Sequence, residues 1–290
     1  MTREELVKHA KLFQQEEITG YNVYKNLAKL TKDKNNKGVL AKIAGEELKH
    51  YNIFKQITGV DIKPKHLLVW FYTMCGRFLG LTFALRLMER AEAKIQKVYE
   101  RVIPHMPEVK AVKESEEEHE DKLIELIQEE RLDYAGSMVL GLNDALVELT
   151  GALAGFSLAM QNTRLVAVAG LITGIAASLS MAASQYLSVK TENDKRHAGK
   201  SAVYTGLAYI ITVAVLILPF IFSESYMLAL SLTLIFAILI IASFNFYIAV
   251  AKNLNFKHRF FEMVVISIGV SALTFGIGLL VRNYLGISID

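Results

Sequence analysis

The second half of the chain is almost continuously apolar, and this limits its fold more than any other feature. From Met138 to Leu285, hydrocarbon side chains are interrupted only by short polar loops. A helix needs about 20 apolar residues to cross a bilayer core. Five segments have about that length: Met138–Met160, Leu165–Val189, Ala202–Phe222, Tyr226–Val250 and Phe260–Val281. We therefore predict five membrane-spanning helices.

The first half is charged and predicts a separate domain outside the membrane. Charged residues crowd between Thr2 and Arg131, and apolar residues recur there at the three- and four-residue spacing of helices. Three breaks divide this region into two helical hairpins and a linking segment: Thr31–Gly38, Gly59–Pro64 and Pro104–Pro107. We predict an all-α chain, with a four-helix bundle at residues 1–132 and the spans at 133–290. The fourth helix should continue into the first span, because Ile127–Tyr134 contains no glycine or proline.

The segment that links the two hairpins, at residues 65–87, is apolar and aromatic. Arg77 in its middle argues against a sixth span, because a charge at the bilayer centre is costly. We interpret the segment as an interfacial helix on the membrane surface or in a subunit interface, with Trp70 and Tyr72 in the headgroup layer. The alternative is a buried crossover between the hairpins.

The distribution of charge and cysteine predicts the partners and the orientation. The net charge of +3 is small, and the basic residues do not alternate with aromatics as in nucleic-acid-binding proteins. The single cysteine, Cys75, cannot form an internal disulfide. The loops at 190–200 and 251–259 are basic, whereas the other loops between spans are nearly uncharged. The positive-inside tendency therefore predicts a cytoplasmic N-terminal domain and an external C-terminus.

Candidate metal ligands lie on all four helices of the predicted bundle. Two pairs of the form Glu-x-x-His fall on the second and fourth helices: Glu47 with His50, and Glu116 with His119. Residues three apart share a helix face, so each pair can hold one metal ion. The first and third helices add single glutamates, Glu17 and Glu92. A carboxylate-bridged pair of iron or manganese ions uses this set of ligands, and oxygen and imidazole donors suit Fe(II).

Three more residues belong to this hypothesis. Tyr24 and Tyr99 each follow a ligand glutamate by seven residues, which returns almost to the same helix face. Each hydroxyl could hydrogen-bond a ligand carboxylate; the alternative is that both tyrosines are packing residues. Glu89 lies one turn before Glu92 and is either the true terminal ligand or a spare carboxylate that moves with oxidation state.

Four segments resemble the ligand segments of the rubrerythrin branch of the ferritin-like superfamily: Phe-Gln-Gln-Glu-Glu-Ile-Thr-Gly-Tyr-Asn-Val-Tyr, Gly-Glu-Glu-Leu-Lys-His, Glu-Arg-Ala-Glu and Glu-Glu-Glu-His. The resemblance covers roughly the first 130 residues and implies a di-iron cofactor. It assigns the ligands to Glu17, Glu47, His50, Glu92, Glu116 and His119. One departure is that Cys75 alone cannot build the cysteine-ligated iron module that usually supplies electrons to peroxide-reducing rubrerythrins.

The first span carries two carboxylates, Asp144 and Glu148, which are four residues apart and therefore on one face. Carboxylates at membrane depth are costly and usually mark an ion path. The alternative for Asp144 is an N-cap on a helix that starts at the interface. Met181 in the second span is either a packing residue or a soft ligand for a transition metal.

The segments Gly-Leu-Asn-Asp-Ala-Leu-Val-Glu and Ser-Met-Ala-Ala-Ser-Gln-Tyr-Leu-Ser resemble the first two spans of the vacuolar iron transporter family. The resemblance implies five spans, a homodimer, exchange of Fe(II) or Mn(II) for protons, and roles for Asp144 and Met181. Gln185 stands where relatives often have glutamate. Fusions with a ferritin-like domain are known as membrane-bound ferritins, and this chain looks like one.

We therefore predict a transporter that exports Fe(II) or Mn(II) from the cytoplasm by proton antiport. Its transport site would comprise Asp144, Glu148 and Met181, and its di-iron domain would bind iron and either oxidise or sense it. The expected partners are the metal ions, protons, the lipid bilayer and a second copy of the chain, with no nucleic acid. The alternative is a membrane-anchored di-iron oxidase or peroxidase.

Overall fold

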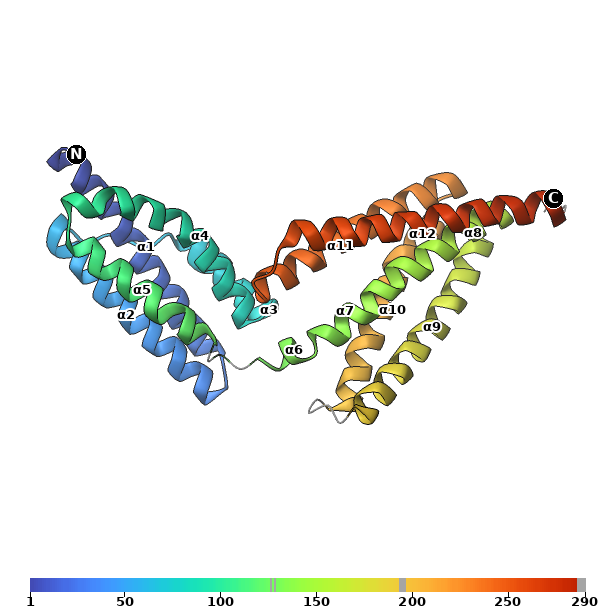
Figure 1. The fold of residues 1–290 in the computed structure, drawn as a ribbon, viewed down its shortest axis with the longest axis horizontal. Coiled ribbons are helices and arrows are strands. Elements are labelled where there is room, and N and C mark those ends of the chain that lie inside the picture. The colour runs from blue at the N-terminus through green and yellow to red at the C-terminus, as the bar shows by residue number, and fades with distance from the viewer. Residues whose placement is uncertain (126, 128, 193–196, 286–290) are drawn as a thin grey trace. The chain divides into compact units, whose positions relative to one another are not determined.

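The computed structural model describes residues 1–125, 127, 129–192 and 197–285. Every regular element in these residues is a helix, which confirms the all-α prediction (Figure 1). The chain divides into two compact units, Met1–Glu129 and Glu130–Asp290, whereas the predicted boundary followed residue 132.

The described residues of unit 1, Met1–Glu129, form four long helices and one short helix. They are α1 (Arg3–Leu30), α2 (Lys34–Thr58), α3 (His66–Phe78), α4 (Leu81–Val102) and α5 (Glu108–Glu125), with a 3-10 turn at Ile103–His105. Helices α1 and α2 lie side by side as a hairpin (Figure 1). Asp33 caps α2 by accepting a hydrogen bond from the Asn36 backbone, so the break before α2 is shorter than the predicted 31–38.

The core of unit 1 consists of two apolar clusters. The first joins residues from α1, α2, α4 and α5, including Phe13, Phe54, Val102 and Val109. The second joins residues from α1, α2, α3 and α4, including Val23, Leu40, Val69 and Leu85. On each of α1, α2 and α4, the residues of one cluster and those of the other occupy different stretches of the helix. The helix positions between these two stretches therefore form a layer between the clusters. This layer holds the candidate ligands.

The prediction of one interfacial helix at residues 65–87 is wrong in its extent. Two helices occupy this segment: α3, and the first part of α4. Gly80 breaks the chain between them with a φ of 110°, a conformation that only glycine adopts readily. Tyr72, which was expected in the headgroup layer, is instead buried in the second apolar cluster. Trp70 is exposed, as the interfacial interpretation expects.

Helix α5 does not continue into the first membrane helix, contrary to the prediction. It ends at Glu125. In the described residues between it and α7, which starts at Ala135, the one regular element is the four-residue helix α6 (Glu130–Asp133). Ile127 packs into the second apolar cluster. The Glu129 carboxylate accepts a hydrogen bond of 3.0 Å from the Thr82 backbone N–H, at the open N-terminus of α4. These tertiary contacts override a local sequence that lacks helix breakers.

Within the described residues of unit 2, Glu130–Asp290, five helices are long and apolar enough to cross a membrane, which confirms the predicted number. The first combines α7 (Ala135–Asp144), a π-helical turn (Ala145–Leu149) and α8 (Thr150–Met160). The others are α9 (Thr163–Thr191), α10 (Ala198–Phe222), α11 (Tyr226–Ala251) and α12 (Phe256–Leu285). All the ends that were predicted for the spans lie within four residues of the observed membrane-length helices.

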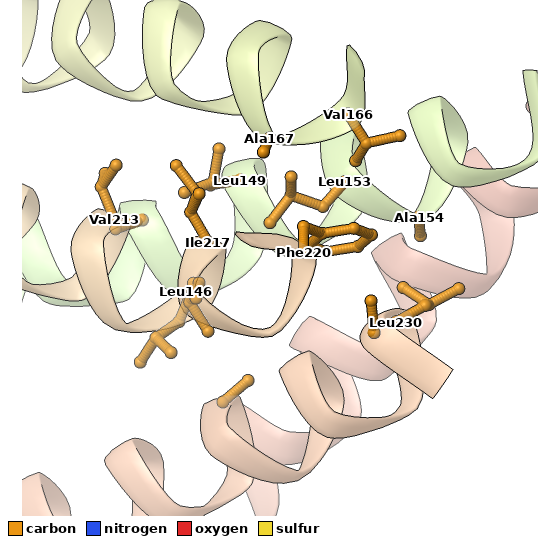
Figure 2. Packing of buried hydrophobic residues seen from close by; sticks show 14 of the residues in the cluster. Leu146, Leu149, Leu153, Ala154, Val166, Ala167, Val213, Ile217, Phe220 and Leu230 are labelled. Atoms are coloured by element: carbon orange, nitrogen blue, oxygen red, sulfur yellow. The ribbon is translucent and has the colours of Figure 1, made fainter. Parts of the chain in front are cut away.

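The core of unit 2 forms around the first membrane helix. Figure 2 shows Leu146, Leu149 and Leu153 of this helix packed with Ile217 and Phe220 of α10. All of these side chains are almost fully buried. Because the leucines immediately flank the predicted carboxylates, the packing of α10 also fixes the part of the helix that carries them.

Close backbone contact holds α7 against α10. A Cβ atom added to Gly141 would collide with the Thr205 carbonyl oxygen. The Thr205 hydroxyl also donates a 3.0 Å hydrogen bond to the Ser137 carbonyl oxygen. Small residues that permit such approach, together with interhelical hydrogen bonds, drive helix association in lipid, where the hydrophobic effect between helices is absent.

We expect Gly141→Ala to lower the apparent melting temperature of the detergent-solubilised chain, because the methyl group must push two backbones apart, at a cost of about 1–3 kcal/mol. Gly269→Ala is the matched control, because an added Cβ there meets nothing within 4 Å. Circular dichroism during heating measures both. Equal melting temperatures for the two variants would show that the contact between α7 and α10 does not hold unit 2 together.

Candidate functional site

The layer between the two apolar clusters of unit 1 is a small pocket rich in carboxylates. Its empty volume is about 300 Å³, and its lining comes from α1, α2, α4 and α5: Glu16, Glu17, Glu47, Glu92, Ile95, Tyr99 and Glu116. Glu17 is only 3% exposed and Glu47 only 8%. Buried carboxylates of this kind require compensating positive charge or protons, because an uncompensated charge is expensive away from water.

Three ligand atoms converge beside this pocket. Oxygen or nitrogen atoms of Glu17, His50 and Glu116 all lie within 4.8 Å of one another. The His50 Nδ1 atom lies 3.4 Å from Glu17 Oε2, but it is buried and makes no hydrogen bond. Its other ring nitrogen, Nε2, lies 3.4 Å from the Ser115 hydroxyl, which can orient the ring. A bound cation would satisfy the buried nitrogen and the carboxylates together, so the residues fit an iron or manganese ion.

Tyr99 joins two of these carboxylates. Its hydroxyl lies 3.1 Å from Glu17 Oε1 and 3.5 Å from Glu116 Oε1. Burial, reinforced by the charges of Glu17 and Glu116, raises the pKa of the Tyr99 phenol well above its ordinary value. The phenol therefore stays protonated and donates to the carboxylates. The Phe13 ring packs against the Tyr99 ring in a T-shaped pair, with ring centroids 4.4 Å apart, and helps to fix its position.

Three residues of the predicted site either do not line this pocket or lie outside the described side chains. Tyr24 is fully buried in the second apolar cluster and does not belong to the pocket lining described above. Glu89 pairs with Arg86 at 2.8 Å, whereas Glu92 lines the pocket, so the geometry favours Glu92 of the two as a ligand. The side chain of His119 lies outside the described residues, although its backbone belongs to α5.

Two residues that line the pocket, Glu16 and Ile95, were not expected from the sequence. Glu16 lines it and forms an ion pair with Lys65, a contact between segments that no local pattern indicates. Gly20 lies opposite Glu47, and a Cβ atom there would be 2.7 Å from Glu47 Oε2. A signal for Gly20 was present, because it follows Glu17 by three residues and therefore shares the ligand face of α1.

The carboxylates of unit 2 lie near the middle of the first membrane helix, which spans Ala135–Met160. Asp144 is the last residue of α7 and has helical backbone angles without a capping hydrogen bond, so the N-cap alternative is wrong. Glu148 lies in the π-helical turn and accepts a hydrogen bond of 3.4 Å from the Tyr209 hydroxyl of α10. Asp144 is half-buried, whereas Glu148 is exposed on the single chain.

The π-helical turn was not predicted, because no local sequence pattern indicates it. It is held by hydroxyl groups that bind the Leu146 carbonyl oxygen: the Ser267 hydroxyl of α12 donates at 2.7 Å, and the Thr150 hydroxyl also donates. Such turns occur frequently at functional sites, because they displace backbone and side chains from regular helical positions. Here the turn changes the angular offset between Asp144 and Glu148.

The two residues of α9 that the sequence singled out, Met181 and Gln185, differ in their surroundings. Met181 is half-buried and packs against the apolar cluster of unit 2, as its structural alternative expects. Gln185 is buried, and its side-chain amide donates a hydrogen bond of 3.2 Å to the Ser137 hydroxyl of α7. This bond ties the second membrane helix to the first, about two helical turns before Asp144.

The sequence model of the VIT family matches residues 135–200. The matched part contains Asp144, Glu148 and Met181, and it is the part in which the motifs resemble the vacuolar iron transporters. Together with the five apolar helices, the match supports a multi-pass integral membrane protein whose membrane unit is similar to metal transporters for iron or manganese. No curated protein sequence and no solved structure matches the chain significantly.

We expect Gly20→Ala to weaken Mn(II) binding to unit 1 by about tenfold, because the new methyl group displaces the Glu47 carboxylate from the pocket. Gly45→Ala on α2 is the control, since an added Cβ there meets nothing within 4 Å. Paramagnetic resonance titration of the full chain in detergent measures free and bound Mn(II). Equal affinities in the two variants would remove Glu47 from the metal site.

Proposed function

We propose that the chain exports Fe(II) or Mn(II) from the cytoplasm in exchange for protons. The observation that carries the proposal is the pair Asp144 and Glu148, in the middle of a membrane helix and within the part that is similar to the VIT family. Carboxylates at this depth are rare without a role in ion passage. Such a pair can bind a divalent cation and take up protons when the cation leaves, which keeps the charge in the membrane low.

The direction of transport rests on the loops. The loops at 190–200 and 251–259 are basic, and the positive-inside tendency favours a cytoplasmic location for them and for unit 1. A metal-binding pocket in unit 1 then meets the cytoplasmic metal pool. Its ligands would collect the ion from that pool, and the membrane carboxylates would pass it outward.

A second copy of the chain belongs to the proposal. Glu148 is exposed on the single chain, and a carboxylate that faces lipid is costly. A homodimer that covers this side of the first membrane helix would remove the cost and enclose a path for ions. The implied partner is therefore an identical chain, as in the family that the motifs resemble.

In unit 1, Glu17, His50 and Glu116 would hold the metal, with Glu47 and Glu92 from the same pocket completing a di-iron or di-manganese centre. A bound iron pair would supply redox chemistry towards oxygen or peroxide. The chain's own residues prepare the site: the Tyr99 phenol keeps its proton and orients Glu17 and Glu116, and the two apolar clusters limit the access of water. The site serves either to oxidise the metal or to sense it.

The same pocket favours the alternative function, a membrane-anchored di-iron oxidase or peroxidase. That function uses Glu17, His50 and Tyr99 but leaves Asp144 and Glu148 without a task. The two functions separate in a simple comparison: an enzyme turns over peroxide in detergent without any vesicle, whereas a transporter moves metal only across a sealed membrane.

We expect Asp144→Asn to reduce Mn(II) flux into proteoliposomes by at least about tenfold, because the amide neither carries charge nor exchanges a proton. Glu224→Gln is the matched control, since Glu224 lies in the exposed loop between α10 and α11. A fluorescent chelator trapped inside the vesicles records the flux. Wild-type flux in Asp144→Asn would remove this residue from the transport site and contradict the proposed path.

A further inference from the structure

Helix α3 of unit 1 carries large apolar side chains on the side that does not face the core. Leu67 is 77% exposed, Trp70 62%, Phe71 44% and Phe78 68%. Together with the half-buried Met74, they recur at three- and four-residue spacing and therefore form one stripe along the helix. We call these five residues the α3 face. A water-soluble surface rarely exposes so contiguous an apolar patch without a partner.

The opposite side of α3 fixes the orientation of this face. Val69 and Tyr72 are buried in the second apolar cluster, and Cys75 is buried as well. An added Cβ atom on Gly76 would collide with the Leu27 side chain of α1, so the two helices are in close contact. The helix therefore cannot rotate to hide the α3 face without losing its own packing. The exposure of the α3 face is therefore fixed by the packing of unit 1.

The charged side chains carried by α3 and its flanking sequence have one sign. From Ile62 to Met88 the sequence contains no aspartate or glutamate, but it contains Lys63, Lys65, His66, Arg77 and Arg86. Lys63 and Arg77 are exposed, and the Arg77 guanidinium lies 5.9 Å from the centroid of the Phe78 ring, at the edge of the α3 face. An apolar stripe with a basic border is the pattern of a helix that lies in the headgroup layer of an anionic bilayer.

We propose that α3 binds the membrane surface, with the α3 face inserted among lipid headgroups and Lys63 and Arg77 paired with anionic lipid phosphates. The inference is independent of the metal chemistry and of the proposed transport. A lipid surface is favoured over a protein partner because the same chain carries five membrane-length helices, which keep a bilayer within reach at high effective concentration. Tryptophan, which belongs to this face, also prefers the interface between water and hydrocarbon.

The sequence offers a direct probe, because Trp70 is the single tryptophan of the chain. The full chain would be placed in nanodiscs of phosphatidylcholine and phosphatidylserine, with bromine atoms on the upper part of the acyl chains. Bromine quenches only tryptophan in close contact with it. We expect the emission of Trp70 to fall at least about twofold relative to discs without bromine, as for other side chains that insert at the interface.

A matched control moves the single tryptophan. The double variant Trp70→Phe, Leu12→Trp keeps an aromatic ring on α3 and puts the indole on α1, where Leu12 is 38% exposed. Its emission should not respond to bromine. In a second variant, Arg77→Glu, quenching of Trp70 should weaken in phosphatidylserine discs, because the new carboxylate is repelled by anionic lipid.

Two outcomes overturn the proposal. If neither bromine nor acrylamide quenches the emission of Trp70, then protein, and not lipid, covers the α3 face. Emission that ignores bromine and is quenched by acrylamide would mean that the face stays in water. Both quenching measurements use the intact chain, and the variants substitute only exposed positions, so we expect every variant to fold. Circular dichroism of each variant verifies this.

Discussion

A carboxylate removed from water must find a proton or a cation, and both units of this chain are arranged around that requirement. In unit 1, Glu17 and Glu47 lie between two apolar clusters, with a buried His50 nitrogen that has no hydrogen-bond partner. In unit 2, Asp144 and Glu148 lie in the middle of an apolar helix. The remaining structure supplies what these groups need: fixed positions, a few polar contacts and limited water.

The means of fixing them differ between the units. Unit 1 can use the hydrophobic effect, so aromatic packing holds Tyr99 against its carboxylate partners. Unit 2 lies in an apolar medium, where burying hydrocarbon gives no hydrophobic gain over lipid. Its side-chain packing is therefore supplemented by small residues and hydroxyl groups. Gly141 admits the α10 backbone, and Ser267 binds the carbonyl of Leu146 in the π-helical turn.

Much of this arrangement could be predicted from the sequence, because it depends on local periodicity. Span length sets the five membrane helices, and the helical repeat brings Glu17, Glu47 and Glu116 to one layer. What could not be predicted depends on contacts between distant segments. The end of α5 depends on where Ile127 and Glu129 find partners, and the π-helical turn depends on hydroxyl groups from another helix. A sequence window carries no information about either.

Exchange of a metal ion for protons at the membrane carboxylates can be tested by recording both movements at once. Wild-type chain in proteoliposomes would be given an inward Mn(II) gradient, with a metal-sensitive and a pH-sensitive dye inside. We expect the lumen to become more alkaline as Mn(II) enters, and both signals to stop together when the gradient is removed. Entry of Mn(II) with no change in lumenal pH would rule out the exchange.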